Sequence, residues 1–537
     1  MTRKKELLLL LVILTIASFF RLWQLSSIPP ALYPDVAING NEALQALETK
    51  DFKVFYPENN GREGFFINLI AFSFLIFGVS VWSIKIVSAI IGILTVLGIY
   101  LFTKESFGYA KIKNSGIIAL ASSFFLAISF WHVNFSRLGF RAIFTPFIMV
   151  FSFYFLFKGF RTKKLANFII AGLIFGLGFH TYISFRLAVL LLMGVLFIWL
   201  LIYKKEKETK KYFFFAFCLF FSIFIIALPI GIYFLQHPGD FVGRATGVSV
   251  FSQPNPIKVF IKSVFVHLAM FNLKGDGNWR HNIAGSPVLF WPIGILFLIG
   301  IFISLKKFLY SLKNKDYSLF LLHSTLLGWL MVMVLPSALT YEGIPHSLRS
   351  IGAIPPVLIF SAMGMEFLYR KIKERVEKLP RKNLWGKFLF LDLILLISFF
   401  TFAEYQRYFV IWGENPEVKG AFTQSYFELG KYLNSLPGGT SKYVIVNEPG
   451  VSVPFPNGIP MPAQTVMFIE STDSGKNQST YLLTDELNKI RIDENNKLTA
   501  IAMMKYDDGL LEKITQMFPD GQIYKQESFG VYLINNN

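Results

Sequence analysis

Runs of about 20 apolar residues recur along the chain as far as residue 405, and they constrain its fold more than any other feature. Each run is long enough to cross the roughly 30 Å hydrocarbon core of a bilayer as a helix. The composition agrees, because 53% of the 537 residues are hydrophobic and only 16% are charged, against about 25% charged in soluble domains. We therefore expect an α-helical protein that crosses a membrane many times.

Eleven of these runs are predicted to span the membrane. They lie near residues 7–25, 83–103, 115–135, 143–160, 166–182, 186–203, 212–235, 288–305, 319–336, 350–369 and 388–404. The run 65–79 is also apolar but short, and counting it would separate the N-terminal cations from the later basic loops. We expect 65–79 to form an interfacial or re-entrant helix instead.

The net charge of +18 is compatible with nucleic-acid binding, but the cations lie in short loops between spans. With eleven spans, Arg3-Lys4-Lys5 and the loops 104–113, 158–164, 204–211, 306–315 and 370–387 share one side and hold 27 of the 52 Lys and Arg residues. The positive-inside rule makes that side cytoplasmic. We therefore expect no nucleic-acid partner, but a multi-pass protein of the cell membrane with a cytoplasmic N-terminus.

The first apolar run resembles a signal peptide, but no small-x-small cleavage site follows it. Arg21-Leu22-Trp23 at its end is typical of an interfacial anchor. We therefore favour an uncleaved anchor, and either alternative leaves the later spans on the same sides.

The same parity places two long loops, 26–82 and 236–287, on the outer side together with the tail 406–537. Apolar runs in the tail shrink to strand length at 443–446, 465–469 and 498–504, with helical patterns at 420–436 and 508–518. Strands that alternate with helices predict a small α/β domain, and about 130 residues can bury their own core. We expect a transmembrane domain over 1–405 and an accessory extracytoplasmic domain over 406–537.

The first outer loop holds the strongest candidate for catalysis. Pro34 suits the first turn of a helix, where the carboxylate of Asp35 is stabilised by the helix N-terminus. Asn39 and Glu42 follow at i+4 and i+7, so an acid, an amide and a second acid share one helical face. The alternative is the ordinary acidity of a helix start with a solvated polar face.

Arginines also gather on the outer side, against the positive-inside bias. They are Arg137, Arg141, Arg186, Arg244, Arg280 and Arg349. The forked guanidinium group suits phosphate oxygens, so the set indicates an anionic lipid headgroup. For any one of them the alternative is snorkelling to the interface.

Three outer histidines, His180, His281 and His346, come from separate loops and show no ligand spacing with one another. We interpret them as supporting polar contacts, together with Tyr182, and predict no metal site and no required cofactor, although a divalent cation is compatible with them.

Residues 1–405 resemble the GT-C class of membrane glycosyltransferases. Within it they are most similar to proteins related to the protein O-mannosyltransferases (glycosyltransferase family 39) and to lipid A aminoarabinose transferase. The segments that carry the resemblance are Leu32-Tyr33-Pro34-Asp35 with Asn39-Gly40 and Glu42-Ala43, Asn59-Asn60-Gly61-Arg62-Glu63-Gly64, Ser136-Arg137-Leu138-Gly139-Phe140-Arg141, His180-Thr181-Tyr182-Ile183-Ser184-Phe185-Arg186, Gly275-Asp276-Gly277-Asn278-Trp279-Arg280-His281-Asn282 and Pro345-His346-Ser347-Leu348-Arg349. Their order and common sidedness make the combination specific.

The resemblance implies a polyprenyl-phosphate-linked sugar as donor and a protein, lipid or surface-polymer acceptor, joined at the outer face by an inverting displacement. Asp35 then serves as general base, and Arg137, Arg141, Arg186, Arg280 and Arg349 are candidates for the donor phosphate. The family usually has Asp-Glu in the first loop, whereas Val36 follows Asp35 here. Glu42 and Glu63, the latter beside Arg62, are candidates for the second acid.

Two other functions are compatible with many spans. A transporter or flippase usually places ionisable groups near mid-membrane, whereas here they lie at span ends and in outer loops. A non-catalytic scaffold that presents the tail has no need of a polar first loop opposed by arginines.

Overall fold

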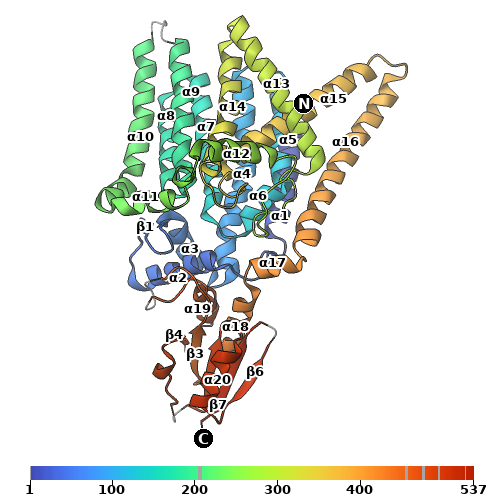
Figure 1. Cartoon of the computed structure of the whole chain (residues 1–537). Coiled ribbons are helices and arrows are strands. Elements are labelled where there is room, and N and C mark those ends of the chain that lie inside the picture. Colours follow the sequence, from blue (N-terminus) through green and yellow to red (C-terminus); the bar gives the residue numbers. More distant parts are fainter. Residues whose placement is uncertain are drawn as a thin grey trace. The chain divides into compact units, whose positions relative to one another are not determined.

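The structure of the chain, a computed structural model, describes residues 2–203, 208–453, 458–473, 478–493, 496–526 and 528–536 (Figure 1). It divides into two compact units. Unit 1 comprises Met1–Leu25 and Ser88–Glu414, and unit 2 comprises Ser26–Val87 and Asn415–Asn537. The first outer loop therefore groups with the C-terminal residues, and unit 2 begins again at Asn415 rather than at the predicted 406.

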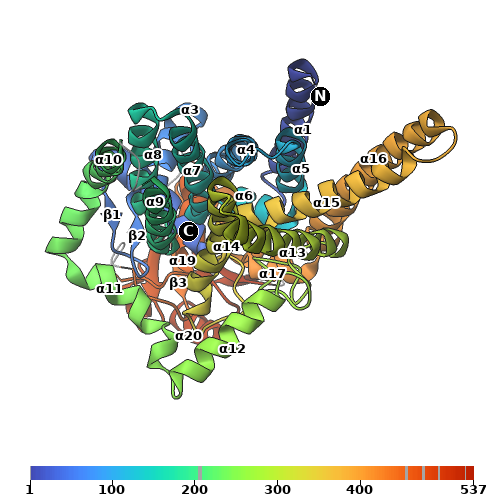
Figure 2. The ribbon, with the colours of Figure 1, turned by 90° about the horizontal axis from the view of Figure 1, so that it is seen from above.

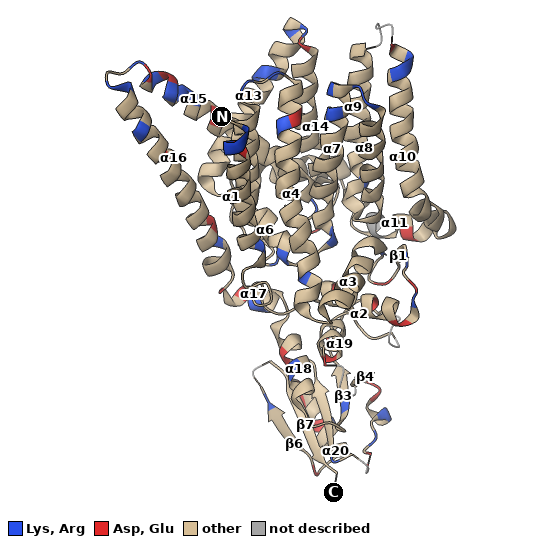
Figure 3. Cartoon of the chain, turned by 180° about the vertical axis from the view of Figure 1, so that it is seen from behind, with Lys and Arg blue, Asp and Glu red and all other residues tan. Residues whose placement is uncertain are grey.

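Unit 1 is a helical bundle. Its helices are α1 (Arg3–Leu22), α4 (Val81–Tyr109, whose first residues belong to unit 2), α5 (Ser115–Ile128), α6 (Phe130–Arg137), α7 (Phe144–Thr162), α8 (Leu165–Leu177), α9 (Ala188–Tyr203), α10 (Thr209–Gln236), α11 (Pro238–Gly247), α12 (Pro256–Ala269), α13 (Trp291–Asn314), α14 (Tyr317–Ala338), α15 (Ile354–Val376) and α16 (Lys382–Tyr405). Figure 3 shows that Lys and Arg gather at the end of the bundle where α13 meets α14 and α15 meets α16.

Every predicted span corresponds to a helix, but the count of eleven is not confirmed. Among the described residues, eight helices are long and apolar enough to cross a membrane, or nine if the bent pair α5 and α6 is one span. Helix α8 is short, and α1 carries three cations and an acid in its first turn. The run 65–79 forms a short apolar helix, α3 (Gly64–Phe77), so the predicted helix is confirmed, and its interfacial or re-entrant placement stays a prediction.

Arg21 stabilises the bend of 55° between α5 and α6. Its guanidinium donates to the carbonyl oxygens of Leu126 (3.0 Å) and Ala127 (2.9 Å), which have no partner within the helix because α5 ends there. Arg21 is fully buried, so its interpretation as an interfacial anchor is wrong. A single sequence does not reveal this partner, since it lies more than 100 residues away.

Unit 2 joins the first outer loop to an α/β fold. Its elements are α2 (Pro34–Thr49), β1 (Phe55–Tyr56), β2 (Arg62–Glu63), α3, α17 (Pro416–Ala421), α18 (Gln424–Ser435), β3 (Ser441–Val446), α19 (Ala463–Ser471), β4 (Thr480–Leu483), β5 (Leu498–Met503), α20 (Asp508–Met517), β6 (Gln522–Lys525) and β7 (Gly530–Asn535).

The five-stranded sheet of unit 2 has the order β4-β3-β5-β7-β6. Strands β4, β3 and β5 are parallel, whereas β7 is antiparallel to both β5 and β6. Alternate residues bury the two faces: Val444 and Ala502 lie in a core with α18 and α19, while Ile445 and Ile501 lie in a core with α20. The predicted strands at 443–446 and 498–504 and the helices near 420–436 and 508–518 are confirmed.

The third predicted strand, 465–469, is wrong, because these residues lie in α19. This helix is buried on two sides. Ile469 packs against Gly430 of α18, and Phe468 packs against Gly40 of α2. A short helix that is buried on several faces has a continuous run of apolar residues in its sequence. The spacing of apolar residues does not distinguish such a run from a buried strand.

Candidate active site

Helix α2 presents the predicted polar face of the first outer loop. It begins with Pro34 at its first position. Asn39 Oδ1 and Glu42 Oε1 accept hydrogen bonds from the same guanidinium, that of Arg62, at 2.8 Å and 2.5 Å. The two residues therefore share one face of α2, and the buried side chain of Arg62 links that face to the following hairpin.

The β1–β2 hairpin sets the position of Arg62. Tyr56 pairs with Arg62 and Phe55 with Glu63 in an antiparallel ladder. At the next residue, Gly64, a Cβ atom would lie 2.1 Å from the carbonyl oxygen of Lys53, so a side chain does not fit there. Glycine thus lets the hairpin close tightly and holds Arg62 against α2.

Asp35 lies one turn before Asn39 and is half-buried. Its Oδ1 atom accepts a hydrogen bond of 2.9 Å from Asn59 Nδ2. Among the described residues no second hydrogen bond to this carboxylate is seen. One amide donor orients the group and leaves an oxygen with the lone pairs that a proton acceptor requires.

Glu42 has an unusual environment for an acid. Burial raises its pKa to about 7, although the charge and hydrogen bond of Arg62 act to lower it, and the neighbouring Glu58 raises it further. Within the described part of the chain, Glu42 Oε2 and Glu58 Oε2 are buried and receive no N–H donor. The two carboxyl groups instead interact with each other, which favours a protonated Glu42. Glu63 is also buried and directly precedes α3. Both candidates for a second acid are thus held inside unit 2.

The C-terminal residues of unit 2 support α2 directly. Asn41 Nδ2 donates to the side-chain and backbone oxygens of Gln464 in α19, at 2.8 Å and 3.1 Å. Thr465 Oγ1 donates to the carbonyl oxygen of Leu32, just before α2, at 3.0 Å. Helix α19 therefore fixes both the start and the middle of the helix that carries Asp35.

A second polar cluster lies in unit 1, between the loop after α12 and the loop after α14. Its centre is the buried carboxylate of Asp276. Asp276 accepts from the backbone N–H of Asn278 (2.9 Å), from His281 Nδ1 (3.0 Å), and from the N–H (2.9 Å) and hydroxyl (3.0 Å) of Ser347. Trp131 Nε1 donates to the Ser347 carbonyl at 3.1 Å, which ties α6 to the same cluster.

His281 and His346 face each other in this cluster, with ring centroids 4.9 Å apart. Burial acts to raise the pKa of Asp276, but the hydrogen bond and charge of His281 outweigh it and lower the pKa to about 2. Burial lowers the pKa of His346 well below its usual value, and His281 and Arg349 act in the same direction. The cluster is therefore an aspartate–histidine pair beside a neutral imidazole.

Asp276, His281 and His346 each place one ligand atom within 4.8 Å of the others, so they form the group of described residues that could hold a metal ion. Because Asp276 already accepts from four donors, we expect it not to bind the metal itself but to orient His281, a possible metal ligand, through the hydrogen bond to its Nδ1 atom. The Nε2 atoms of the two histidines then supply neutral ligands of the kind that transition metals prefer.

The arginines that are candidates for binding the donor phosphate differ in the groups that they contact. Arg137 is fully buried and donates to the carbonyl oxygens of Phe20, Trp23 and Gln24 at 2.6–3.0 Å, where α1 ends. Because these backbone groups occupy its guanidinium, Arg137 has a structural role. This changes its interpretation as a phosphate ligand.

Two further arginines bind backbone groups of their own surroundings. Arg349 donates to Thr340 Oγ1 (2.8 Å) and the Glu342 carbonyl (3.1 Å), and Arg186 donates to the Phe241 carbonyl (2.9 Å). Arg141 lies over the ring of Tyr182, 5.5 Å from its centroid, and the half-buried Arg280 directly precedes His281. The side chain of Arg244 lies outside the described residues.

His180 and Tyr182 also lie in unit 1. His180 Nε2 is 2.8 Å from the carbonyl oxygen of Ile226, a contact that joins the end of α8 to α10. Tyr182 supplies the ring beneath Arg141. Asp276 was not singled out from the sequence, although it lies in a predicted motif five residues before His281. The Asp-x₄-His spacing within one loop was the available signal.

Residues 65–233 match the protein family described as dolichyl-phosphate-mannose-protein mannosyltransferase. The fold is similar to that of ArnT from Cupriavidus metallidurans bound to undecaprenyl phosphate, with a TM-score of 0.57, 12% identity, and coverage of 99% of this chain and 98% of that one. The whole chain therefore has the fold of these membrane glycosyltransferases, and one segment of it matches a mannosyltransferase family.

A second GT-C structure, the apo oligosaccharyltransferase of Archaeoglobus fulgidus, is similar with a TM-score of 0.51 and 14% identity, over 83% of this chain and 62% of that one. No curated protein sequence matches the chain. The similarity thus lies in the fold, at low sequence identity. The expected GT-C-like fold and the multi-pass membrane character are confirmed.

Proposed function

We propose that this GT-C enzyme moves a sugar from a polyprenyl-phosphate-linked donor to an acceptor hydroxyl or amine, with Asp35 as general base. The observation that carries the proposal is the geometry of Asp35. Its half-buried carboxylate accepts one hydrogen bond, from the amide of Asn59, and its helix α2 is held in place by α19. The similarity to a structure bound to undecaprenyl phosphate supports the class of donor.

The mechanism follows from the charges that the reaction creates. The acceptor loses its proton as its oxygen or nitrogen attacks the anomeric carbon, and the Asp35 carboxylate accepts that proton. The bond from the anomeric carbon to the phosphate oxygen breaks, and the polyprenyl phosphate leaves as an anion. Since phosphate leaves without prior protonation, one carboxylate suffices, unlike the pair used by glycosidases. A single displacement inverts the anomeric centre.

Arg141 and Arg280 are the arginines that we assign to the donor phosphate. Both belong to loops of unit 1 that the sequence places on the outer side, and Arg280 directly precedes His281. Their guanidinium groups would stabilise the negative charge that grows on the departing phosphate. Arg137, Arg186 and Arg349 are assigned to positioning instead, because they bind backbone oxygens.

Glu42 and Arg62 act through Asp35 as positioning residues in this proposal. Their ion pair joins α2 to the β1–β2 hairpin, whose connecting turn contains Asn59, the residue that orients Asp35. The reaction therefore does not require Glu42 or Glu63 as a second catalytic acid, which accommodates Val36 at the family's usual second-acid position.

We also propose that a divalent cation is not obligatory. His281 and His346 fit a transition metal, with Asp276 behind His281, but the base and the phosphate ligands named above include none of these residues. Dialysis against a chelator should leave transfer intact. A loss of transfer that Zn²⁺ or Mn²⁺ restores would instead place the cation in the reaction.

The site is proposed to face outward at the cell membrane, with unit 2 extracytoplasmic and the basic loops cytoplasmic. The acceptor is then a protein, lipid or surface polymer at that face. Cysteine-accessibility labelling in intact cells tests this orientation, with a cysteine placed at Asp51 in the first outer loop and another at Lys382.

The central test is Asp35→Asn, which keeps the size of the side chain and removes the base. Membranes that contain the full chain are incubated with a panel of radiolabelled polyprenyl-phosphate sugars and then examined for labelled macromolecules. Transfer should fall by about 10²–10⁴-fold while the donor lipid still binds. Asp51→Asn is the matched control, because Asp51 is an exposed acid of the same loop.

Normal transfer by Asp35→Asn would overturn the assignment of the base. Loss of donor binding in the same variant would assign Asp35 to binding rather than to proton transfer. If the wild-type chain moves donor lipid between leaflets without labelling any acceptor, it is a transporter, and the reaction proposed here is wrong.

A further inference from the structure

Helices α15 and α16 form a feature of unit 1 that the transfer reaction does not use. The apolar part of α15 is 78% buried inside the protein, whereas that of α16 is only 6% buried. Figure 2 shows the two helices extending to one side of the other helices of unit 1. The wedge between them contains two adjoining cavities, one apolar and one basic.

The apolar cavity lies where the start of α13 meets α15 and α16. Its volume is about 400 Å³, and Asp392 is its one acidic wall residue. Its lining includes Trp291, Ile295, Leu368, Ile372, Leu393 and Leu396. A groove of this kind between membrane helices suits hydrocarbon chains, since it offers contact area and almost no hydrogen-bonding group.

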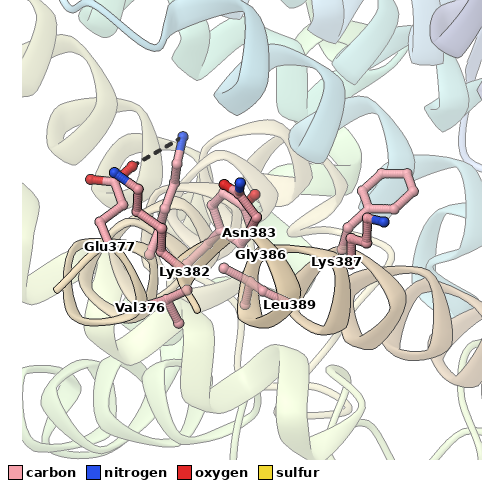
Figure 4. A pocket seen from close by; sticks show the side chains of 10 residues that line it. Val376, Glu377, Lys382, Asn383, Gly386, Lys387 and Leu389 are labelled. Carbon is pink, nitrogen blue, oxygen red and sulfur yellow. Dashed lines mark ion pairs between the residues drawn. The ribbon is translucent and has the colours of Figure 1, made fainter. Parts of the chain in front are cut away.

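The basic cavity continues from it toward the turn between α15 and α16, and the two share Tyr369 and Leu389 as wall residues. Its volume is about 840 Å³. Figure 4 shows Lys382, Asn383 and Lys387 of α16 with Glu377 at the end of α15. Three lysines and one glutamate line it, Lys373 being the third, so the cavity carries a formal charge of +2.

The acids of α15 pair with cations of α15, and Asp392 lines the adjoining apolar cavity rather than the basic one. Glu377 lies 3.9 Å from Lys373, and Glu374, on the adjacent surface of α15, pairs with Arg370 and Lys371. Among the described residues, Lys382 and Lys387 have no acidic partner. The ammonium groups of Lys382 and Lys387 therefore lie beside the apolar cavity and can bind an anion.

We propose that this groove and pocket bind one anionic phospholipid, with its acyl chains in the apolar cavity and its headgroup phosphate on Lys382 and Lys387. Charge complementarity selects the occupant, because basic pockets between membrane helices on the cytoplasmic side hold anionic headgroups. A zwitterionic lipid brings a second cation into the same pocket. The lysines of the site belong to the predicted cytoplasmic loop 370–387.

The test measures lipid retention and does not depend on glycosyl transfer. The full chain in a neutral detergent is incubated with phosphatidylglycerol or with phosphatidylcholine of the same acyl chains, and retained lipid is counted by native mass spectrometry. The wild type should retain phosphatidylglycerol roughly tenfold better. Lys382→Gln/Lys387→Gln should abolish this preference, whereas Lys306→Gln/Lys313→Gln removes the same charge from exposed positions of α13 and should not.

A second variant tests the apolar part. Leu396→Trp fills the groove and should reduce retention of both lipids. The proposal is overturned if the α16 lysine variant keeps its phosphatidylglycerol, or if the wild type shows no preference between the lipids. It is also overturned if Leu396→Trp retains both as well as the wild type does. Unchanged thermal unfolding of each variant excludes misfolding as the cause of a loss.

Discussion

Glu42 in unit 2 and Asp276 in unit 1 are both buried acids beside a basic side chain, yet their environments act in opposite directions. The pKa of Glu42 is raised to about 7, and that of Asp276 is lowered to about 2. Burial disfavours the charged form of both. The difference lies in the neighbours. Asp276 accepts from four donors, whereas Glu42 accepts from Arg62 and faces the carboxyl group of Glu58.

This comparison teaches that, where burial opposes ionisation of both acids, the donors and charges of the neighbouring groups decide which one stays ionised. Asp276 is a fixed anion that orients His281. Glu42 is an acid near the boundary between its two protonation states, and its charge depends on Arg62. The two regions should therefore respond differently to mutation and to pH.

Removing Arg62 should have the largest effect. Arg62→Met leaves Glu42 buried without its cation, which should destabilise unit 2 by about 3–5 kcal/mol at pH 8. The cost should be smaller at pH 5, because a protonated Glu42 needs no partner. Thermal unfolding of the purified chain at both pH values measures this difference. Arg62→Met/Glu42→Leu should recover most of the stability, and Lys50→Met, at an exposed cation of the same loop, is the control.

Glu42 also predicts a pH dependence of stability. Because its pKa is higher in the folded chain than its usual 4.5, its contribution is fully present below about pH 4.5 and is lost as the pH rises through about 7. The loss amounts to about 3 kcal/mol. The free energy of unfolding of the wild type should fall between pH 4.5 and 8. In Glu42→Gln this fall should be smaller by the contribution of Glu42. An unchanged slope in that variant would contradict the raised pKa.

For Asp276 we expect the opposite dependence of stability on pH, and at lower pH values. Its pKa is lowered, so its contribution is present above about pH 4 and is lost as the pH falls toward 2. Asp276→Asn should destabilise the chain by about 2–3 kcal/mol at neutral pH, because its amide nitrogen replaces one of the two acceptor oxygens. Either the Asn278 donor at Oδ1 or the His281 and Ser347 donors at Oδ2 then lose their acceptor. The fall of stability between pH 4.5 and 8 that we assign to Glu42 should be unchanged in this variant. If it disappears, Asp276 rather than Glu42 causes it.

The contrast also shows what the sequence could predict. The common face of Asn39 and Glu42 was predictable, because a helical repeat is a local property of the chain. Many span positions followed from the apolar runs for the same reason. The partner of that face was not predictable, since Arg62 reaches α2 only when the β1–β2 hairpin closes.

Long-range partners account for the other differences. Arg21 and Arg137 resemble interfacial or ligand-binding arginines in sequence, but each binds carbonyl oxygens where a distant helix ends. The run 465–469 resembles a strand because helices cover α19 on two sides. In each case the deciding contact joins residues that are far apart along the chain, which a single sequence does not specify.

The smallest predicted effect concerns Asn59, which separates positioning from catalysis. Asn59→Ala removes the amide that orients Asp35 and should lower the transfer rate about tenfold. Asn60→Ala is a matched control, because both asparagines have positive φ, 48° and 62°, so the backbone cost of alanine is shared. In the Asp35→Asn background, Asn59→Ala should have no further effect, because the carboxylate that it orients is gone. Equal rates for the Asn59 and Asn60 variants would show that the hydrogen bond to Asp35 does not contribute to transfer.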